Sequence, residues 1–136
     1  MDTKQRSSGA GATILIVDDT FEWRAQVREI LETQTGLRVI GEACDGLEAI
    51  QRAAELNPDL VLLDIAMPRL NGLEAADQIR RTAPRSKIVF LTQERDAEIR
   101  LSALAAGALG YVLKTSALRE LLPTITEALR NGYAAD

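Results

Sequence analysis

The stretch Ile14-Leu15-Ile16-Val17-Asp18-Asp19 (ILIVDD) joins four consecutive apolar residues to two carboxylates. A short apolar run of this kind is typical of a strand buried on both faces of a parallel sheet. Three further runs have the same form and also end on a polar group: Leu60–Leu63 before Asp64, Ile88–Leu91 before Thr92, and Tyr111–Leu113 before Lys114. Because ligands of open α/β sheets bind outside the carboxyl ends of the strands, we predict that these polar groups converge on one crevice.

Segments of helical periodicity alternate with these runs, which is the pattern of repeated βα units. With Arg38–Cys44 as a further strand and the last strand extending over Gly110–Lys114, the chain has five predicted strands and five predicted helices. The predicted fold class is therefore α/β, a doubly wound (βα)5 parallel sheet with helices on both faces. We predict a disordered leader over residues 1–12, one folded domain over 13–132, and a free tail or the start of a linker over 133–136.

Apolar stripes identify the faces that the predicted helices bury. Thr20 and Ser116 are the predicted N-caps of the first and last helix, and Pro123 is expected to kink or soften the last one. The stripes are Trp23, Val27, Ile30 and Leu31 in the first helix, Leu47, Ile50 and Ala54 in the second, Leu73, Ala76 and Ile79 in the third, and Leu118, Leu121, Leu122, Ile125, Ala128 and Leu129 in the last.

The composition excludes several classes of site. A net charge of −4 argues against a general nucleic-acid surface, which needs a basic stripe. The chain has no histidine, which removes imidazole metal ligands and a phosphohistidine, and its one cysteine, Cys44, fits a reducing compartment. No apolar run approaches the about 20 residues that span a bilayer, and the N-terminus has no signal core. We therefore expect a cytoplasmic protein without membrane attachment.

Asp18, Asp19 and Asp64 are the main candidates for a functional site. Carboxylate oxygens are usual ligands of Mg²⁺, and three close carboxylates without a cation would repel one another. Asp64 is the candidate nucleophile, because a carboxylate can accept a phosphoryl group as an acyl phosphate. Lys114 can neutralise the transferred charge, and the Thr92 hydroxyl can donate a hydrogen bond to a phosphoryl oxygen.

These residues, in this order and strand context, resemble the receiver domain of two-component response regulators. The matching pieces are Asp18-Asp19, Asp64 with Met67-Pro68 beyond it, Thr92, and the sequence from Gly107 to Lys114 (GALGYVLK). The resemblance covers Thr13 to about Gly132. It implies a flavodoxin-like strand order of 2-1-3-4-5 and phosphorylation of Asp64 by a sensor histidine kinase.

The resemblance also implies a role for each matching residue. Mg²⁺ would be bound by Asp19, Asp64 and the backbone carbonyl of Ala66, with Asp18 acting through water. Lys114 would pair with the phosphoryl group, Thr92 would move toward it, and Tyr111 would change rotamer with Thr92. The added charge of roughly −1.5 to −2 would then bias a two-state element.

The resemblance places the control of phosphate loss at three positions: Ala66, Gln93 and Glu94. Gln93 is larger than the residue usual after the switch threonine, and could narrow access to Asp64. Ala66 is small where a polar side chain is common. The lifetime of the phosphorylated state is therefore open.

Three rival functions are weaker. A haloacid-dehalogenase-like phosphatase places its nucleophile after the first strand, in an Asp-x-Asp pattern, and this chain has no cap insertion. A nucleotide-binding module would need a glycine-rich turn after the first strand, where this chain has two acids. A pseudo-receiver scaffold would not need the intact acid, threonine and lysine set. We expect no enzyme activity beyond the chain's own phosphorylation and dephosphorylation.

The output is left open by the sequence. Leu121–Tyr133 and GALGYVLK resemble receivers of LuxR/FixJ-type transcription regulators, which carry a helix-turn-helix domain after a linker. The first expectation is a receiver that controls such a domain, makes no DNA contacts of its own and can form a phosphorylation-dependent homodimer. The alternative is a stand-alone receiver that relays phosphate or binds a protein partner.

Overall fold

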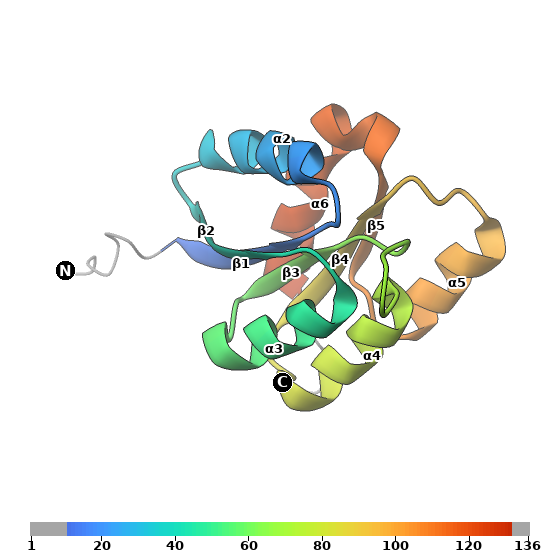
Figure 1. Ribbon diagram of the computed structural model, residues 1–136. Coiled ribbons are helices and arrows are strands. Elements are labelled where there is room, and N and C mark those ends of the chain that lie inside the picture. Colours follow the sequence, from blue (N-terminus) through green and yellow to red (C-terminus); the bar gives the residue numbers. More distant parts are fainter. Residues whose placement is uncertain (1–10, 132–136) are drawn as a thin grey trace.

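The computed structural model describes residues 11–131 as a five-stranded parallel sheet between two layers of helices (Figure 1). The strand order is β2-β1-β3-β4-β5, which confirms the predicted doubly wound α/β fold. The elements in chain order are β1 (Ala12–Val17), α2 (Phe21–Glu32), β2 (Leu37–Ala43), α3 (Gly46–Leu56), β3 (Leu60–Leu63), α4 (Gly72–Thr82), β4 (Lys87–Thr92), α5 (Ala97–Ala105), β5 (Gly110–Leu113), the 3₁₀ turn η1 (Lys114–Ser116) and α6 (Ala117–Asn131).

The predicted boundaries of β3 agree with the observed ones, and those of the other strands differ by one or two residues. β1 begins at Ala12, which the sequence placed in the leader, and the Ala12 amide donates to the carbonyl of Gly36. β2 is displaced by one residue towards the N-terminus. β5 ends at Leu113, so that Lys114 opens the turn η1 instead of closing the strand. The rest of the predicted leader and the predicted tail lie outside the described residues.

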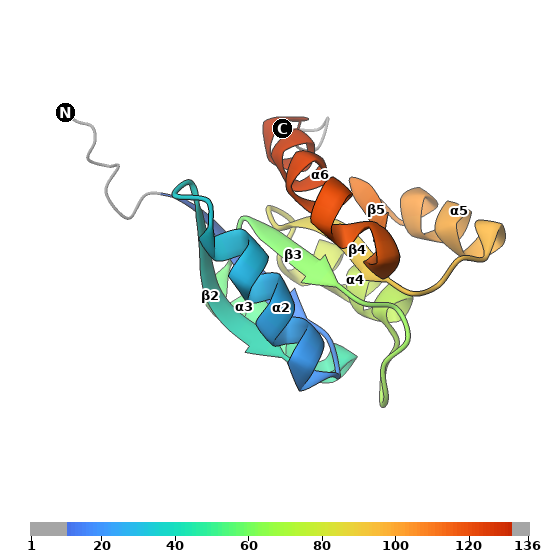
Figure 2. The same ribbon diagram turned by 90° about the horizontal axis from the view of Figure 1, so that it is seen from above.

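Each face of the sheet packs against its own layer of helices. Helices α2 and α6 cover one face, and α3, α4 and α5 cover the other (Figure 2). Successive residues of β1 alternate between the two layers: Leu15 and Val17 contact the side of α3–α5, while Ile14 and Ile16 contact the side of α2 and α6. Because both faces are covered, each of the strands β1, β3 and β4 contains four consecutive apolar residues.

The face that α3 buries differs from the predicted stripe. Ala49 and Ala53 are fully buried, whereas Leu47 and Ala54 are exposed and Ile50 is only partly buried. Alanines let α3 lie close to the sheet and to α4, while Ile50 packs against the edge of this cluster and Leu47 turns outward. The sequence prediction gave leucine too much weight and alanine too little.

The N-terminal part of α6 also differs from the prediction. Ser116 belongs to η1, and the buried stripe is Ala117, Leu121, Ile125 and Ala128. Leu118 is 89% exposed, because the 3₁₀ turn sets the rotation of the helix that follows it. The helix is continuous through Pro123.

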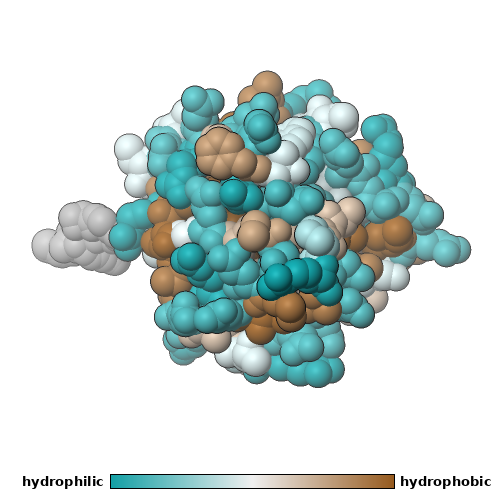
Figure 3. Space-filling view, in the orientation of Figure 1, coloured by the Kyte–Doolittle hydropathy of each residue, from teal (hydrophilic) through white to brown (hydrophobic). Residues whose placement is uncertain are grey.

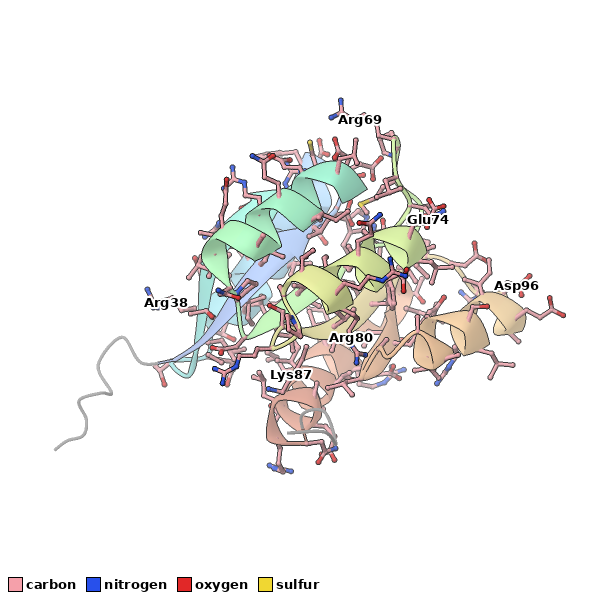
Figure 4. All side chains as sticks on the ribbon, turned by 90° about the horizontal axis from the view of Figure 1, so that it is seen from below. Arg38, Arg69, Glu74, Arg80, Lys87 and Asp96 are labelled. Atoms are coloured by element: carbon pink, nitrogen blue, oxygen red, sulfur yellow. The ribbon has the colours of Figure 1, made fainter. Side chains whose placement is uncertain are left out.

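The two ends of the sheet carry different groups. Figure 4 shows Arg69 and Asp96, in loops that follow strands, at one end, and Arg38 and Lys87 at the other. The face seen in Figure 3 is mainly hydrophilic, with hydrophobic side chains in small separate groups. No helix within residues 11–131 is long and apolar enough to cross a membrane.

Candidate functional site

Three carboxylates meet at the carboxyl end of the sheet. Asp18 and Asp19 follow β1 and Asp64 follows β3, two strands that pair directly. One oxygen from each of the three lies within 4.8 Å of the others. Asp18 and Asp64 are buried and Asp19 is exposed. Hard oxygen ligands at this spacing, one of them open to solvent, fit a divalent cation that keeps several waters.

Lys114 is the cation that faces this cluster. Its Nζ lies 2.7 Å from Asp18 Oδ2 and 3.2 Å from Asp64 Oδ2. The lysine side chain is 5% exposed and both carboxylates are 7% exposed, so the ion pairs are largely shielded from water. One ammonium against three carboxylates leaves the site with an excess of negative charge, which a divalent cation would balance.

Each carboxylate oxygen of Asp64 has a hydrogen-bond partner. Its Oδ1 accepts from the amide of Ile65 at 2.7 Å, which leaves Oδ2 for Lys114. Burial raises the pKa of Asp64 above its ordinary range, although Lys114 and a hydrogen bond from Thr92 act in the opposite direction. A cation at the site would favour the ionised form, which is the nucleophilic one.

Thr92 and Tyr111 connect the site to the loop between β4 and α5. Thr92 is buried, and its Oγ1 accepts from the amide of Glu94 at 3.2 Å. The Tyr111 hydroxyl donates to the carbonyl of Glu94 at 2.8 Å, and the Arg100 guanidinium lies 5.6 Å from the centre of its ring. The threonine and the tyrosine thus hold the same residue from two sides.

The loop after β3 carries Ala66 beside Asp64. Ala66 is exposed and lines the hollow above the carboxylates. Gly72 closes the loop by donating its amide to the Ile65 carbonyl at 2.8 Å. A Cβ at Gly72 would collide with the backbone carbonyl of Asp64. The close approach of α4 to the end of β3 therefore requires glycine.

Two contacts of helix α2 with the site were not predicted from the sequence. Arg24 donates to the backbone carbonyl of Asp18 at 2.6 Å and to Glu42 Oε1 at 2.8 Å, which ties the acidic turn to β2. Trp23 was predicted as core; it packs at the edge of the α2 and α6 cluster, and Lys114 Nζ lies 4.8 Å from the centre of its ring.

The structure brings most of the predicted site residues around a single hollow of about 400 Å³. Asp18 lies beside it, bonded to Lys114, and Tyr111 contacts it through Glu94. The residues that line the hollow are Asp19, Thr20, Trp23, Asp64, Ala66, Thr92, Gln93, Glu94 and Lys114.

A profile of the response regulator receiver domain family matches residues 14–126, which is most of the chain. The chain belongs to this family. It is a receiver domain of the kind found in two-component response regulators.

Curated relatives of this receiver domain are longer proteins. The transcriptional regulatory protein LiaR of Bacillus subtilis is 40% identical over 115 residues, which cover 85% of this chain and 54% of LiaR. A protein-glutamate methylesterase/protein-glutamine glutaminase of Thermotoga maritima is 36% identical over 130 residues, which cover 90% of this chain and 38% of that protein. The receiver thus spans about half or less of the length of these relatives.

Solved structures have the same fold. The response regulator domain of Thermotoga maritima CheB aligns with a TM-score of 0.79 and 33% identity, over 90% of this chain and 96% of that one. A LuxR-family two-component response regulator from Aurantimonas sp. aligns with a TM-score of 0.85 and 34% identity, over 90% of this chain and 87% of that one.

Proposed function

We propose that Asp64 is the phosphoacceptor of this receiver and that a sensor histidine kinase is the phosphoryl donor. The observation that carries the proposal is the position of Asp64: a buried carboxylate with one oxygen held by a backbone amide and the other facing Lys114. In the transfer, an oxygen of Asp64 forms a bond to phosphorus, the phosphorus–nitrogen bond of the donor breaks, and the imidazole leaves.

The residues that would hold Mg²⁺ are Asp19, Asp64 and the carbonyl of Ala66, with Asp18 acting through water. The ion would supply neutralisation of the phosphoryl oxygens. On phosphorylation, the Lys114 ammonium would leave the Asp64 carboxylate oxygen and pair with the phosphoryl group instead. Thr92 would supply a hydroxyl donor from the neighbouring strand.

The switch that we propose runs from Thr92 to Tyr111 through Glu94. When the Thr92 hydroxyl turns to the phosphoryl group, it releases the Glu94 amide that it now accepts from. The loop between β4 and α5, whose Glu94 carbonyl accepts from the Tyr111 hydroxyl, can then change its conformation. Ala66, Gln93 and Glu94 line the entrance to Asp64 and would set how quickly water reaches the acyl phosphate.

We propose transcription control as the output, because relatives such as LiaR and NarL are named as regulators. A homodimer formed on phosphorylation is the state that would act, and DNA contacts would come from residues outside this domain.

Treatment with acetyl phosphate and Mg²⁺ tests the acceptor. Intact mass spectrometry should show one added phosphoryl group. Borohydride reduction of a second sample converts aspartyl phosphate into homoserine with release of phosphate, and tandem spectra should find that homoserine at position 64. Asp64→Asn should remove the signal, while Asp77→Asn, on the exposed surface of α4, should keep it. A phosphoryl group on any residue other than Asp64 would overturn the assignment.

A further inference from the structure

The indole of Trp23 forms one wall around the ammonium of Lys114. Lys114 Nζ lies 4.8 Å from the centre of the ring, within the range of a cation–π interaction. The same ammonium bonds to Asp18 at 2.7 Å and to Asp64 at 3.2 Å. The aromatic face is thus the one uncharged group among these three contacts of the ammonium.

Trp23 and Lys114 also line a second hollow, of about 640 Å³, between α2 and the start of α6. Its other lining residues include Glu29, Thr115 and Arg119. A lysine has a flexible four-carbon stem, so its ammonium could turn from the acidic hollow towards Glu29. Contact with the indole face opposes that movement.

We propose that Trp23 is a positioning residue that keeps the Lys114 ammonium beside Asp64, and so sets the rate at which Asp64 accepts a phosphoryl group. A divalent cation at the carboxylates would weaken the pull of Asp18 and Asp64 on Lys114, because two cations repel. The attraction of the indole does not depend on those carboxylates. The contact should therefore matter most in the cation-loaded state. The statement about rate rests on the proposed function, whereas the positioning of Lys114 does not.

The sequence permits a sharp test, because Trp23 is the single tryptophan of the chain. Trp23 can be replaced biosynthetically with 5-fluoro-, 5,7-difluoro- and more highly fluorinated tryptophan. The fluorine atoms withdraw electron density from the face of the indole ring and change the shape of the side chain very little. With acetyl phosphate and Mg²⁺, the maximal phosphorylation rate should fall stepwise along the series, by about 10-fold when the attraction is fully lost. The acetyl phosphate concentration for half-maximal rate should not change. In a Lys114→Met background the series should have no effect.

Substitutions and spectra separate positioning from packing. Trp23→Phe keeps an aromatic face and should retain the rate better than Trp23→Leu. In spectra with Mg²⁺ present, the ε-methylene protons of Lys114 should lose their ring-current shift in Trp23→Leu. Equal rates along the fluorinated series, in a parent that is phosphorylated, would overturn the proposal. If the parent takes up no phosphoryl group, the proposed function fails, and the Lys114 proton shifts alone decide whether Trp23 holds the lysine.

Discussion

The ammonium of Lys114 lies 2.7 Å from a carboxylate oxygen of Asp18. Asp18 follows β1 and Lys114 follows β5, and β3 and β4 lie between those strands in the sheet. The pair therefore joins distant strands across the mouth of the site, out of water. A buried ion pair is costly when one partner is lost, because the other charge stays buried without compensation.

The first prediction concerns the loss of this lysine. Lys114→Met should lower the free energy of unfolding by roughly 3–5 kcal/mol, since Asp18 and Asp64 would remain buried without their cation. Saturating Mg²⁺ should restore part of the loss, measured by urea denaturation with and without the ion. Lys87→Met, at the opposite end of the sheet (Figure 4), is the control. Equal losses in both variants, or no recovery with Mg²⁺, would contradict the proposed charge balance.

The second prediction concerns pH and Asp64. Burial raises the pKa of this carboxyl above its ordinary value of 3.8. The folded state therefore binds the proton more tightly than the unfolded state, and the stability this contributes is lost as the pH rises through the folded pKa. In the absence of Mg²⁺, Asp64→Asn should stabilise the domain at about pH 7 and have no such effect at about pH 3. Thermal unfolding across this range measures the difference, with Asp77→Asn as the surface control; a gain that does not vary with pH would count against the stated cause.

Apolar runs that end on polar groups predicted the parallel sheet and the crevice at its edge, whereas the strand order was predicted from the resemblance to receiver domains. Strand boundaries needed corrections of one or two residues, because strand pairing also includes Ala12 and Thr13 in β1 and Lys87 and Thr92 in β4, which flank the apolar runs. Tertiary packing decided the rest. Ala49 and Ala53 face inward on α3 because the helix lies close to its neighbours, which composition does not reveal. The contact of Arg24 with the Asp18 carbonyl spans six residues through a turn whose geometry the sequence does not determine.

The third prediction concerns the loop that carries Ala66. Gly72→Ala should lower the free energy of unfolding by about 1–3 kcal/mol, because its Cβ would press against the Asp64 carbonyl. The shift of the Asp64 backbone should also slow phosphorylation by acetyl phosphate. Gly36→Ala is the matched control, since nothing lies within 4 Å of a Cβ placed there. A Gly72→Ala protein that is as stable and as reactive as the control would show that the loop can move without cost.

The fourth prediction separates two arginines that share one carboxylate. Arg24 and Arg28 both pair with Glu42, but Arg24 also donates to the Asp18 carbonyl. Arg24→Met should therefore weaken Mg²⁺ binding by about 10-fold or more, as loss of groups that orient metal ligands does, while Arg28→Met should leave the affinity nearly unchanged. Titration followed by Trp23 fluorescence, checked by calorimetry, measures both. Only Arg24 contacts the turn of Asp18 and Asp19. Equal losses of affinity in the two variants would therefore contradict this prediction and assign the effect to the charge that both arginines place beside Glu42.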